Sequence, residues 1–506
     1  MFQRIRTYCL SGIRAIPVNV EVDASPGLPG FTLVGLPDSA VRESRERVVS
    51  AVRSIGKVVT GHRTTVNLSP ADLRKEGASL DLPLAIGMLI ASGEISVKNP
   101  ERYVFMGELS LDGLLKPVHG VLSVAMSLKN DCHCVLVVPQ ENVKEASLVE
   151  GVYVLGVSSL GDCVAALTCE NPPVAKSLGL KKNSENAGST NCPDFADVVG
   201  MEGVKRALEV AAAGGHNFLL VGSPGAGKTL SARCLPGILP EMTEEEILES
   251  TRIHSCARFV TAEEFKYIAT RPFRSPHHSA SMVSLIGGGA RLLPGEASLA
   301  HNGVLFLDEL PEFNRMALES LREPMEEGRI TISRASGSVE WPARFMMGAA
   351  MNPCPCGYAM DPKHGCTCLP EARKRYRERI SGPLLDRIDL QVSVPPVDAM
   401  NFVQKRRGES SASIRERVVF ARTLQQKRSR KFRCNAELTS KAVVEFANME
   451  SATEMFAVSA ADKLQLSARG YYRLLKVART IADLRHAPRV EISDIAEALQ
   501  YRSMRE

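Results

Sequence analysis

The sequence has no apolar run that approaches the ~18 residues needed to cross a bilayer as a helix. Its N-terminal stretch, MFQRIRTYCLSGIRAIPVNVEV, is interrupted by charges and has no apolar core of signal-peptide length. Charge is nearly balanced, with 62 Lys and Arg against 57 Asp and Glu, so the net charge of +5 points to no class of partner. No internal repeat of ~20 to 50 residues is visible. These absences argue against a secreted or membrane protein.

Cysteine is present, but its pattern is not that of a disulfide framework. Thirteen cysteines, an odd number, are scattered through 506 residues. In a chain with a nucleotide-binding motif, such scattered cysteines are typical of reduced thiols. Hydrophobic residues make up 44% and charged residues 24% of the chain, as in soluble globular proteins. We therefore expect a cytoplasmic protein.

The octet GSPGAGKT matches the phosphate-binding loop pattern G-x-x-x-x-G-K-[ST]. It follows the apolar run NFLLV, which indicates a buried strand, and precedes a segment that can continue as a helix. Glycines let successive backbone N–H groups converge on phosphate oxygens, while Lys228 adds a point charge and Thr229 a hydroxyl for Mg²⁺. The residues expected to hold ATP are Gly222, Ser223, Pro224, Gly225, Ala226, Gly227, Lys228 and Thr229.

Two further apolar runs end in polar residues. VLFL is followed by Asp308 and Glu309, and RFMMGAA leads to Asn352. We expect Asp308 to bind Mg²⁺ with Thr229, and Glu309 to polarise the attacking water. The neutral amide of Asn352 can bind the γ-phosphate or orient water without adding negative charge. An Asn before a Pro is otherwise only a turn former.

The segment SGPLLDRID contains a candidate arginine finger, Arg387. An arginine that reaches in from outside the phosphate loop stabilises charge on the transferring phosphoryl group, and it can come from a neighbouring subunit. The alternative for Arg387 is a salt bridge to Asp386 or Asp389.

GSPGAGKT, VLFLDE, MNP and SGPLLDRID occur in this order, and with them the chain resembles the magnesium-chelatase-like AAA+ ATPases, most closely the YifB/ComM family. FRSPHHSASMVSLIGGG and PGEASLAHNGVLFLDELPEF are specific to that group. The resemblance implies ATP and Mg²⁺, Asn352 as sensor one and Arg387 as a finger acting in trans. It also implies a sensor-two arginine in SARGYYRLLK, with Arg469 as first choice and Arg473 as second. Hexameric rings and DNA branch migration during natural transformation are further implications.

The fold class expected is α/β, in four parts. Residues 1–168 form an α/β domain, and the Pro-, Ser- and Asn-rich residues 169–193 a linker. Residues 194–397 form the AAA+ phosphate-loop core around a parallel sheet. Residues 398–506 form a basic connector and an all-helical lid.

The N-terminal domain resembles the Lon protease domain. RKEGASLDLPLAIG places Ser79 where Lon has its nucleophile, whereas the position of the catalytic lysine holds Leu122. A serine without a base to take its proton stays a weak nucleophile. We therefore expect a scaffold or binding module rather than an active protease.

Residues 329–344, RITISRASGSVEWPAR, predict two short strands around a turn at residues 335–337. In the related replicative helicases a hairpin just before sensor one projects into the ring pore. By that resemblance Arg334 would contact phosphates of single-stranded or branched DNA without sequence preference. A solvated hairpin is the alternative. The basic runs EARKRYRER, QKRRGES and QQKRSRKFR are further candidates for DNA contact.

The loop NPCPCGYAMDPKHGCTCLP brings together Cys354, Cys356, Cys366 and Cys368. Four thiolates satisfy tetrahedral Zn²⁺, and a loop so poor in apolar residues would gain order from the metal. The C-x-C spacing is tighter than the usual zinc spacing, so four reduced thiols are the alternative.

The motifs favour an ATP-driven homo-oligomeric ring, a hexamer by family resemblance, that acts on DNA as a helicase or translocase. There are two alternatives. The motor subunit of a metal chelatase would use the same ATPase residues, whereas a regulatory or adaptor protein would need none of them.

Overall fold

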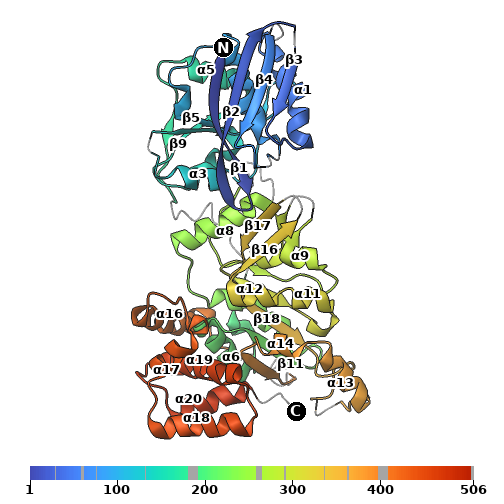
Figure 1. Ribbon diagram of the computed structural model, residues 1–506. Helices are drawn as coiled ribbons and strands as arrows, with labels where there is room; N and C mark the ends of the chain where they lie inside the picture. The colour runs from blue at the N-terminus through green and yellow to red at the C-terminus, as the bar shows by residue number, and fades with distance from the viewer. Residues whose placement is uncertain are drawn as a thin grey trace.

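The computed structural model describes residues 1–28, 30–58, 62–73, 75, 77–131, 133–180, 192–257, 265–289, 292–334, 337–361, 364–396 and 408–502. Three domains follow one another along the sequence (Figure 1). An N-terminal α/β domain rests on a central α/β domain, and a C-terminal helical domain packs against the far side of the central one. None of the helices within these ranges is both long and apolar enough to pass through a lipid bilayer.

The N-terminal domain is built on a mixed sheet with the strand order β10-β9-β8-β5-β1-β2-β4-β3. In β2, Val18, Val20 and Val22 are buried and alternate with more exposed residues, the period expected of a strand with one covered face. Its elements are β1 (Phe2–Ser11), β2 (Arg14–Pro26), β3 (Gly30–Val34), α1 (Ser39–Ser54), β4 (His62–Ser69), α2 (Asp81–Ala91), β5 (Tyr103–Phe105), β6 (Glu108–Leu109), β7 (Leu115–Lys116), α3 (Val121–Leu128), β8 (Val135–Pro139), α4 (Val143–Ala146), β9 (Tyr153–Val157), α5 (Leu160–Thr168) and β10 (Ala175–Lys176).

The central domain is organised around a parallel sheet with the order β12-β15-β18-β11-β19. Strands β11, β15 and β18 are buried at every position, as expected of strands covered on both faces. The elements are α6 (Glu202–Gly214), β11 (Phe218–Gly222), α7 (Lys228–Arg233), α8 (Glu244–Ala257), β12 (Phe273–Arg274), α9 (Met282–Ile286), β13 (Gly287–Gly288), β14 (Leu293–Pro294), α10 (Glu296–Leu299), β15 (Val304–Leu307), α11 (Arg315–Glu319), α12 (Arg322–Glu327), β16 (Arg329–Arg334), β17 (Gly337–Pro342), β18 (Met346–Met351), α13 (Pro370–Glu378), α14 (Gly382–Leu385) and β19 (Leu390–Val394).

The C-terminal domain is helical, as its sequence predicts, with α16 (Ser411–Arg428), α17 (Ser440–Ala447), α18 (Ser451–Lys463), α19 (Ala468–Leu484) and α20 (Ile492–Gln500). Ser467 caps α19 by accepting a hydrogen bond from the N–H of Gly470. Apolar residues of α16, α17, α19 and α20 share one buried cluster with Phe218 and Leu220 of β11. Leu219 and Val221, which point the other way, join a second cluster. The helical domain thus covers one face of the sheet.

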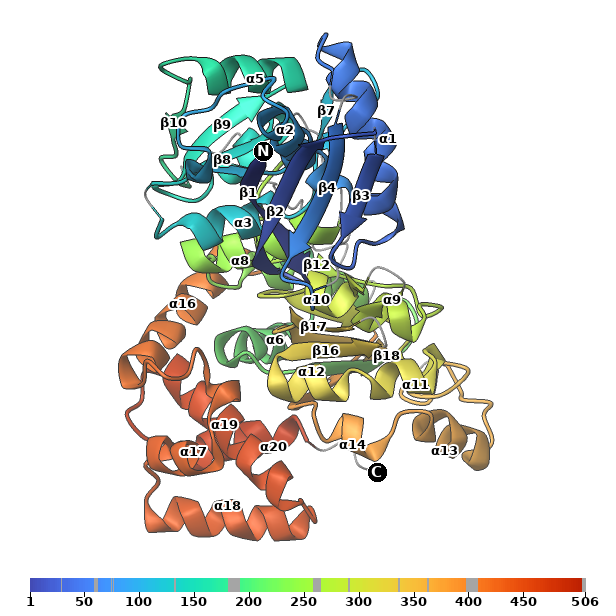
Figure 2. The same cartoon turned by 45° about the horizontal axis from the view of Figure 1, so that its top comes forward.

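Helix α8 attaches the central domain to the N-terminal one, and Figure 2 shows it beneath α3. The Ser255 hydroxyl accepts a hydrogen bond of 3.2 Å from the N–H of Gly120 and donates one to the carboxylate of Glu145. Arg252 donates to the Ser123 hydroxyl at 3.0 Å. Burial raises the pKa of Glu145. Because these groups are buried and mutually satisfied, the junction has the character of a domain interior.

Candidate functional site

The phosphate loop connects β11 to α7 at the carboxyl edge of the parallel sheet. Gly227, at the start of α7, has a φ of +82°, a conformation that side-chain-bearing residues rarely adopt. At Gly222 a Cβ atom would lie 2.4 Å from the carbonyl oxygen of Val394 on β19. The loop therefore needs glycine at both positions, in one case for its backbone angles and in the other for close strand packing.

Lys228 lies folded over this loop. Its Nζ donates to the carbonyl oxygens of Gly222 at 2.6 Å and Ser223 at 2.9 Å, and to Oδ1 of Asn352 at 3.1 Å. Burial lowers the pKa of Lys228, and the charges of Asp308 and Glu309 oppose that shift. The contact with Asn352 joins the loop after β11 to the end of β18, the next strand in the sheet.

Thr229 and Asp308 are in direct contact. The Thr229 hydroxyl donates to Oδ2 of Asp308 at 2.6 Å, and the second carboxylate oxygen accepts from the N–H of Glu309 at 3.0 Å. Hydroxyl and carboxylate oxygens are ligands that Mg²⁺ prefers. The two residues that the sequence assigns to the metal thus lie at one point of the sheet edge.

Glu309 has a positive φ of 55°, which is uncommon for a residue with a side chain. Its carboxylate contacts His278, whose Nδ1 lies 2.9 Å from Oε2 of Glu309. His278 belongs to the FRSPHHSASMVS segment, and no role follows for it from the sequence alone. The structure adds it to the site as the partner of the predicted water-polarising carboxylate.

Arg387 is buried and paired within its own chain. Its Nη2 lies 2.6 Å from Oε1 of Glu326 on α12, and its Nη1 donates to the carbonyl oxygen of Pro383 at 2.8 Å. The ion-pair partner is therefore neither of the two aspartates that the sequence offers as alternatives. Asp389 instead accepts from the N–H of Asn217 at 3.1 Å.

The two candidate sensor-two arginines differ in their surroundings. Arg469 is exposed in the first turn of α19. Arg473, one turn later, lies 3.5 Å from Asp389. Asp389 precedes β19, so Arg473 is at the amino end of the sheet, opposite the phosphate loop. Among the described residues, Arg473 forms an ion pair at the amino end of the sheet and Arg469 does not.

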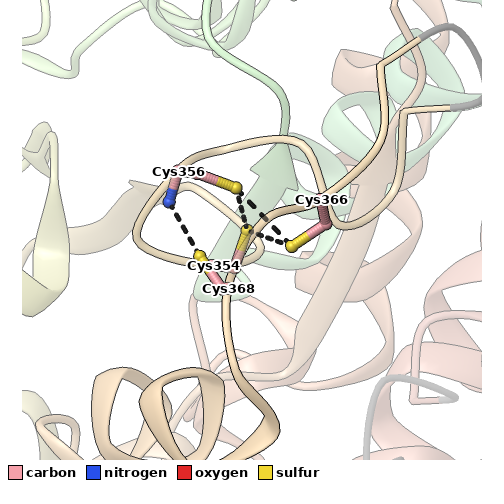
Figure 3. Close-up of side chains that lie close together, drawn as sticks. All are labelled: Cys354, Cys356, Cys366 and Cys368. Atoms are coloured by element: carbon pink, nitrogen blue, oxygen red, sulfur yellow. Dashed lines mark hydrogen bonds between the residues drawn. The ribbon is translucent and has the colours of Figure 1, made fainter.

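The four cysteines converge (Figure 3). Their sulfur atoms all lie within 4.8 Å of one another, and Cys354, the most buried, lies 3.3 Å from Cys356 and 3.6 Å from Cys366. The Cys368 sulfur accepts from the N–H of Cys356 at 3.3 Å. A hydrogen bond from the backbone of Tyr358 lowers the pKa of Cys356 to about 5. The cluster is able to hold a metal ion.

Strands β16 and β17 pair in antiparallel register and form the predicted hairpin. Arg334 is exposed at the end of β16, while the turn residues 335–336 lie outside the described part. At the other end Trp341 is buried between the domains and donates to the carbonyl oxygen of Leu292 at 3.0 Å.

The three basic runs lie in different places. EARKRYRER belongs to α13 and the residue that follows it, QQKRSRKFR begins in α16, and QKRRGES lies largely outside the described residues.

In the N-terminal domain, Ser79 lies in a short 3-10 helix before α2. Leu122 is fully buried in α3, where its N–H donates to Glu145 at 2.9 Å. An apolar side chain at this position is unable to accept a proton from a serine. The same end of α3 contacts α8 of the central domain through Gly120 and Ser123.

The sheet order, the phosphate loop and the Thr229–Asp308 pair define an ATP-binding protein of AAA+ character. Three family models match the chain: "Magnesium chelatase, subunit ChlI" over residues 194–402, "Subunit ChlI of Mg-chelatase" over 20–142, and "Magnesium chelatase, subunit ChlI C-terminal" over 408–502. The chain belongs to the magnesium-chelatase-like YifB/ComM family.

Two full-length relatives support this assignment. Competence protein ComM of Haemophilus influenzae is 44% identical over 97% of this chain and 96% of its own length. YifB of Escherichia coli is 43% identical over 99% of this chain and 97% of its own length. A more distant similarity, to Lon protease 2 of Bacillus subtilis, is 25% identical over 29% of this chain and 26% of that protein.

Proposed function

We propose that this protein is an ATP-hydrolysing ring motor that acts on DNA, as a helicase or translocase. The observation that carries the proposal is the meeting of four predicted residues at one sheet edge, where Lys228 contacts Asn352 and Thr229 contacts Asp308. A likeness to a competence protein over nearly the whole of both chains supports action on DNA. We infer a place in DNA uptake or recombination for the protein.

Each group at the sheet edge has a chemical task. The N–H groups of the loop and the ammonium of Lys228 bind the phosphates, and the hydroxyl of Thr229 with the carboxylate of Asp308 fits Mg²⁺. Mg²⁺ held by these two residues would offset the negative charge of the phosphates. Glu309 orients and polarises the attacking water, with His278 holding the carboxylate at 2.9 Å. Asn352 contacts the γ-phosphate from the side of β18.

Arg387 is proposed to act on the ATP of a neighbouring protomer. Leu390 pairs with Phe218 and Val394 with Gly222. Leu390 and Val394 are four residues apart along β19, which corresponds to a rise of about 13 Å. Arg387 precedes this strand, whereas the phosphate loop follows β11 at the opposite end. Arg387 therefore lies too far along the strand to serve its own loop, and a ring, a hexamer by family resemblance, would supply the missing partner.

Before it acts in trans, Arg387 must exchange Glu326 for a phosphate. The Glu326 side chain is 45% exposed and therefore accessible to solvent, whereas that of Arg387 is 7% exposed, so the exchange must also uncover the guanidinium. We place Arg469 in the sensor-two role, because its exposure at the start of α19 leaves the guanidinium accessible to a nucleotide.

DNA contact is assigned to the β16–β17 hairpin and the basic helices. Arg334 is exposed at the hairpin end, where a phosphate can approach it. Contacts of this kind to single-stranded or branched DNA give affinity without sequence preference.

We further propose that the metal of the four-cysteine cluster is a structural Zn²⁺, since four sulfur ligands suit that ion.

The test is the ATP hydrolysis rate of the purified full chain with and without single-stranded, duplex and four-way-junction DNA. Lys228→Ala and Glu309→Gln are the controls, since the first removes the positive charge that binds the phosphates and the second removes the carboxylate that polarises the attacking water. We expect the wild type to bind DNA and to hydrolyse ATP faster in its presence, and we expect DNA to stimulate hydrolysis by neither variant. Hydrolysis that none of these DNAs changes, together with no DNA binding, would refute the assignment to DNA.

A second candidate is the motor subunit of a metal chelatase, which the family descriptions favour. The chelatase 67 kDa subunit of Chlorobaculum parvum is, however, 27% identical over only 23% of its length, against 96% of ComM. Co-purification with a large porphyrin-binding subunit would support the chelatase function. A pure adaptor would instead keep its function in the Lys228→Ala variant.

A further inference from the structure

The four-cysteine cluster begins where the catalytic strand β18 ends. β18 ends at Met351, and a single proline separates Asn352 from Cys354. Oδ1 of Asn352 is also the acceptor of the 3.1 Å hydrogen bond from Lys228. The position of the Asn352 side chain is therefore set by the same few backbone angles that set Cys354.

A second contact joins the cluster to the phosphate loop itself. Gly357, in the turn after Cys356, packs against Pro224 of the loop. A Cβ on Gly357 would lie 2.5 Å from Cδ and 2.7 Å from Cγ of Pro224, and the residue has a φ of +87°. The N–H of Gly357 donates to the carbonyl oxygen of Cys354 at 3.0 Å, which fixes the turn. The turn after Cys356 therefore packs directly on the phosphate loop, and position 357 has no space for a side chain.

The chain beyond the cluster returns to the same place. Cys368 is followed by α13, whose buried Tyr376 is hydrogen-bonded to the backbone of Asn352. Arg379, just after α13, donates to Glu312 at 2.8 Å, three residues past Glu309. The cysteine loop is consequently tied to the nucleotide site before, within and after its four sulfur atoms.

The sulfur positions suit a zinc ion closely. With Zn–S distances of about 2.3 Å, a tetrahedral site separates neighbouring sulfurs by about 3.8 Å. The separations here among Cys354, Cys356 and Cys366 are 3.3, 3.6 and 3.5 Å, so small outward movements give that geometry. Four cysteine ligands bound to one Zn²⁺ hold the two ends of this loop together. Loss of the ion would remove these bonds and release the turn that packs on Pro224.

We propose that Zn²⁺ at Cys354, Cys356, Cys366 and Cys368 controls the ATP site, because it fixes Asn352 and the turn that packs on Pro224. Metal loss weakens Mg–ATP binding and slows hydrolysis while the three-domain fold remains. The inference rests on the proposed ATPase function only for its hydrolysis readout. Zinc content and nucleotide binding test it without DNA.

The experiment measures zinc per chain by plasma mass spectrometry, and Mg–ATP affinity and hydrolysis before and after a zinc chelator. We expect one zinc per chain, an affinity loss of about tenfold and a rate loss of at least tenfold, both restored by added Zn²⁺. Cys356→Ser with Cys368→Ser should lose zinc and activity without rescue. Cys169→Ser, at an exposed cysteine of the N-terminal domain, is the matched control.

A second pair of variants separates metal binding from coupling. Gly357→Ala places a methyl group against Pro224 and should keep its zinc but lose nucleotide affinity. Gly365→Ala lies in the same loop with open space around its Cβ position and should change neither. A protein without zinc, or one whose nucleotide affinity survives both zinc removal and Gly357→Ala, would overturn the inference. Zinc-dependent ATP binding without any DNA effect would refute only the DNA motor.

Discussion

If Arg387 serves the ATP of a neighbouring protomer, two inactive variants must restore each other. Lys228→Ala removes the charge that binds the phosphates, and Arg387→Ala removes the finger. Each homogeneous ring then lacks one half of every composite site. In a mixed ring, an Arg387→Ala protomer supplies an intact phosphate loop, and a Lys228→Ala neighbour supplies an intact arginine to it.

The size of the effect follows from this geometry. A finger acting in trans contributes about 10³ to 10⁵ in kcat, so Arg387→Ala alone should retain less than about one thousandth of the wild-type rate. Lys228→Ala alone should be inactive, because it lacks the charge that binds the phosphates. When a fraction p of protomers is Lys228→Ala, the fraction of productive interfaces in a head-to-tail ring is p(1−p). Equal amounts therefore give about one quarter of the wild-type rate per protomer, if interfaces act independently.

The assay is steady-state ATP hydrolysis at constant total protein while the ratio of the two variants changes. The rate should follow a parabola with its maximum at equal amounts. Glu326→Gln is the matched control, since it breaks the 2.6 Å ion pair but leaves the guanidinium in place, and it should retain hydrolysis within a few fold. A mixture no faster than the average of its two components would refute the composite site.

Three further predictions concern other parts of the chain. His278→Ala should lower kcat about tenfold with little change in KM, because Glu309 loses its 2.9 Å partner, while His278→Gln should recover most of the rate in steady-state kinetics. Arg334→Ala should weaken binding to all single-stranded sequences alike and reduce the salt slope of log K by about 0.7 in anisotropy titrations. A loss confined to some sequences would contradict phosphate contact. Ser255→Ala should lower the free energy of unfolding by about 1–3 kcal/mol in urea titrations, because buried Glu145 loses a donor, and an unchanged midpoint would argue against the proposed junction.

The meeting of the predicted nucleotide-binding residues could be anticipated, because each of them belongs to a short pattern at the end of an apolar run. Parallel strands place their carboxyl ends at one edge, so residues that follow β11, β15 and β18 had to meet there. The contacts of Lys228 with Asn352 and of Thr229 with Asp308 follow from this rule. Both could be expected without knowing how the helices pack.

Contacts between elements that are distant in sequence could not be anticipated in the same way. Two aspartates beside Arg387 were the local choice of partner, but packing of α12 brings Glu326 to it instead. The contact between Gly357 and Pro224 joins loops after different strands, and no periodicity in either loop indicates it. The pairing of His278 with Glu309 depends likewise on the path of the chain before α9.

The hairpin that carries Arg334 is also attached to the N-terminal domain, and this limits how it can move. Val339 of β17 packs against Gly12, at the turn between β1 and β2, where a Cβ would lie 2.5 Å from the valine Cγ1. Arg14, the first residue of β2, lies 3.8 Å from Glu340. If the hairpin moves along DNA as proposed above, it must either carry the N-terminal domain with it or break these contacts. Val339 and Trp341 of β17 also share a buried cluster with Ile253 and Cys256 of α8, and Leu10 and Ile13 of the N-terminal domain pack against it. Because the Ser255 junction holds the same helix to the N-terminal domain, we expect the hairpin, α8 and the N-terminal domain to move as one unit.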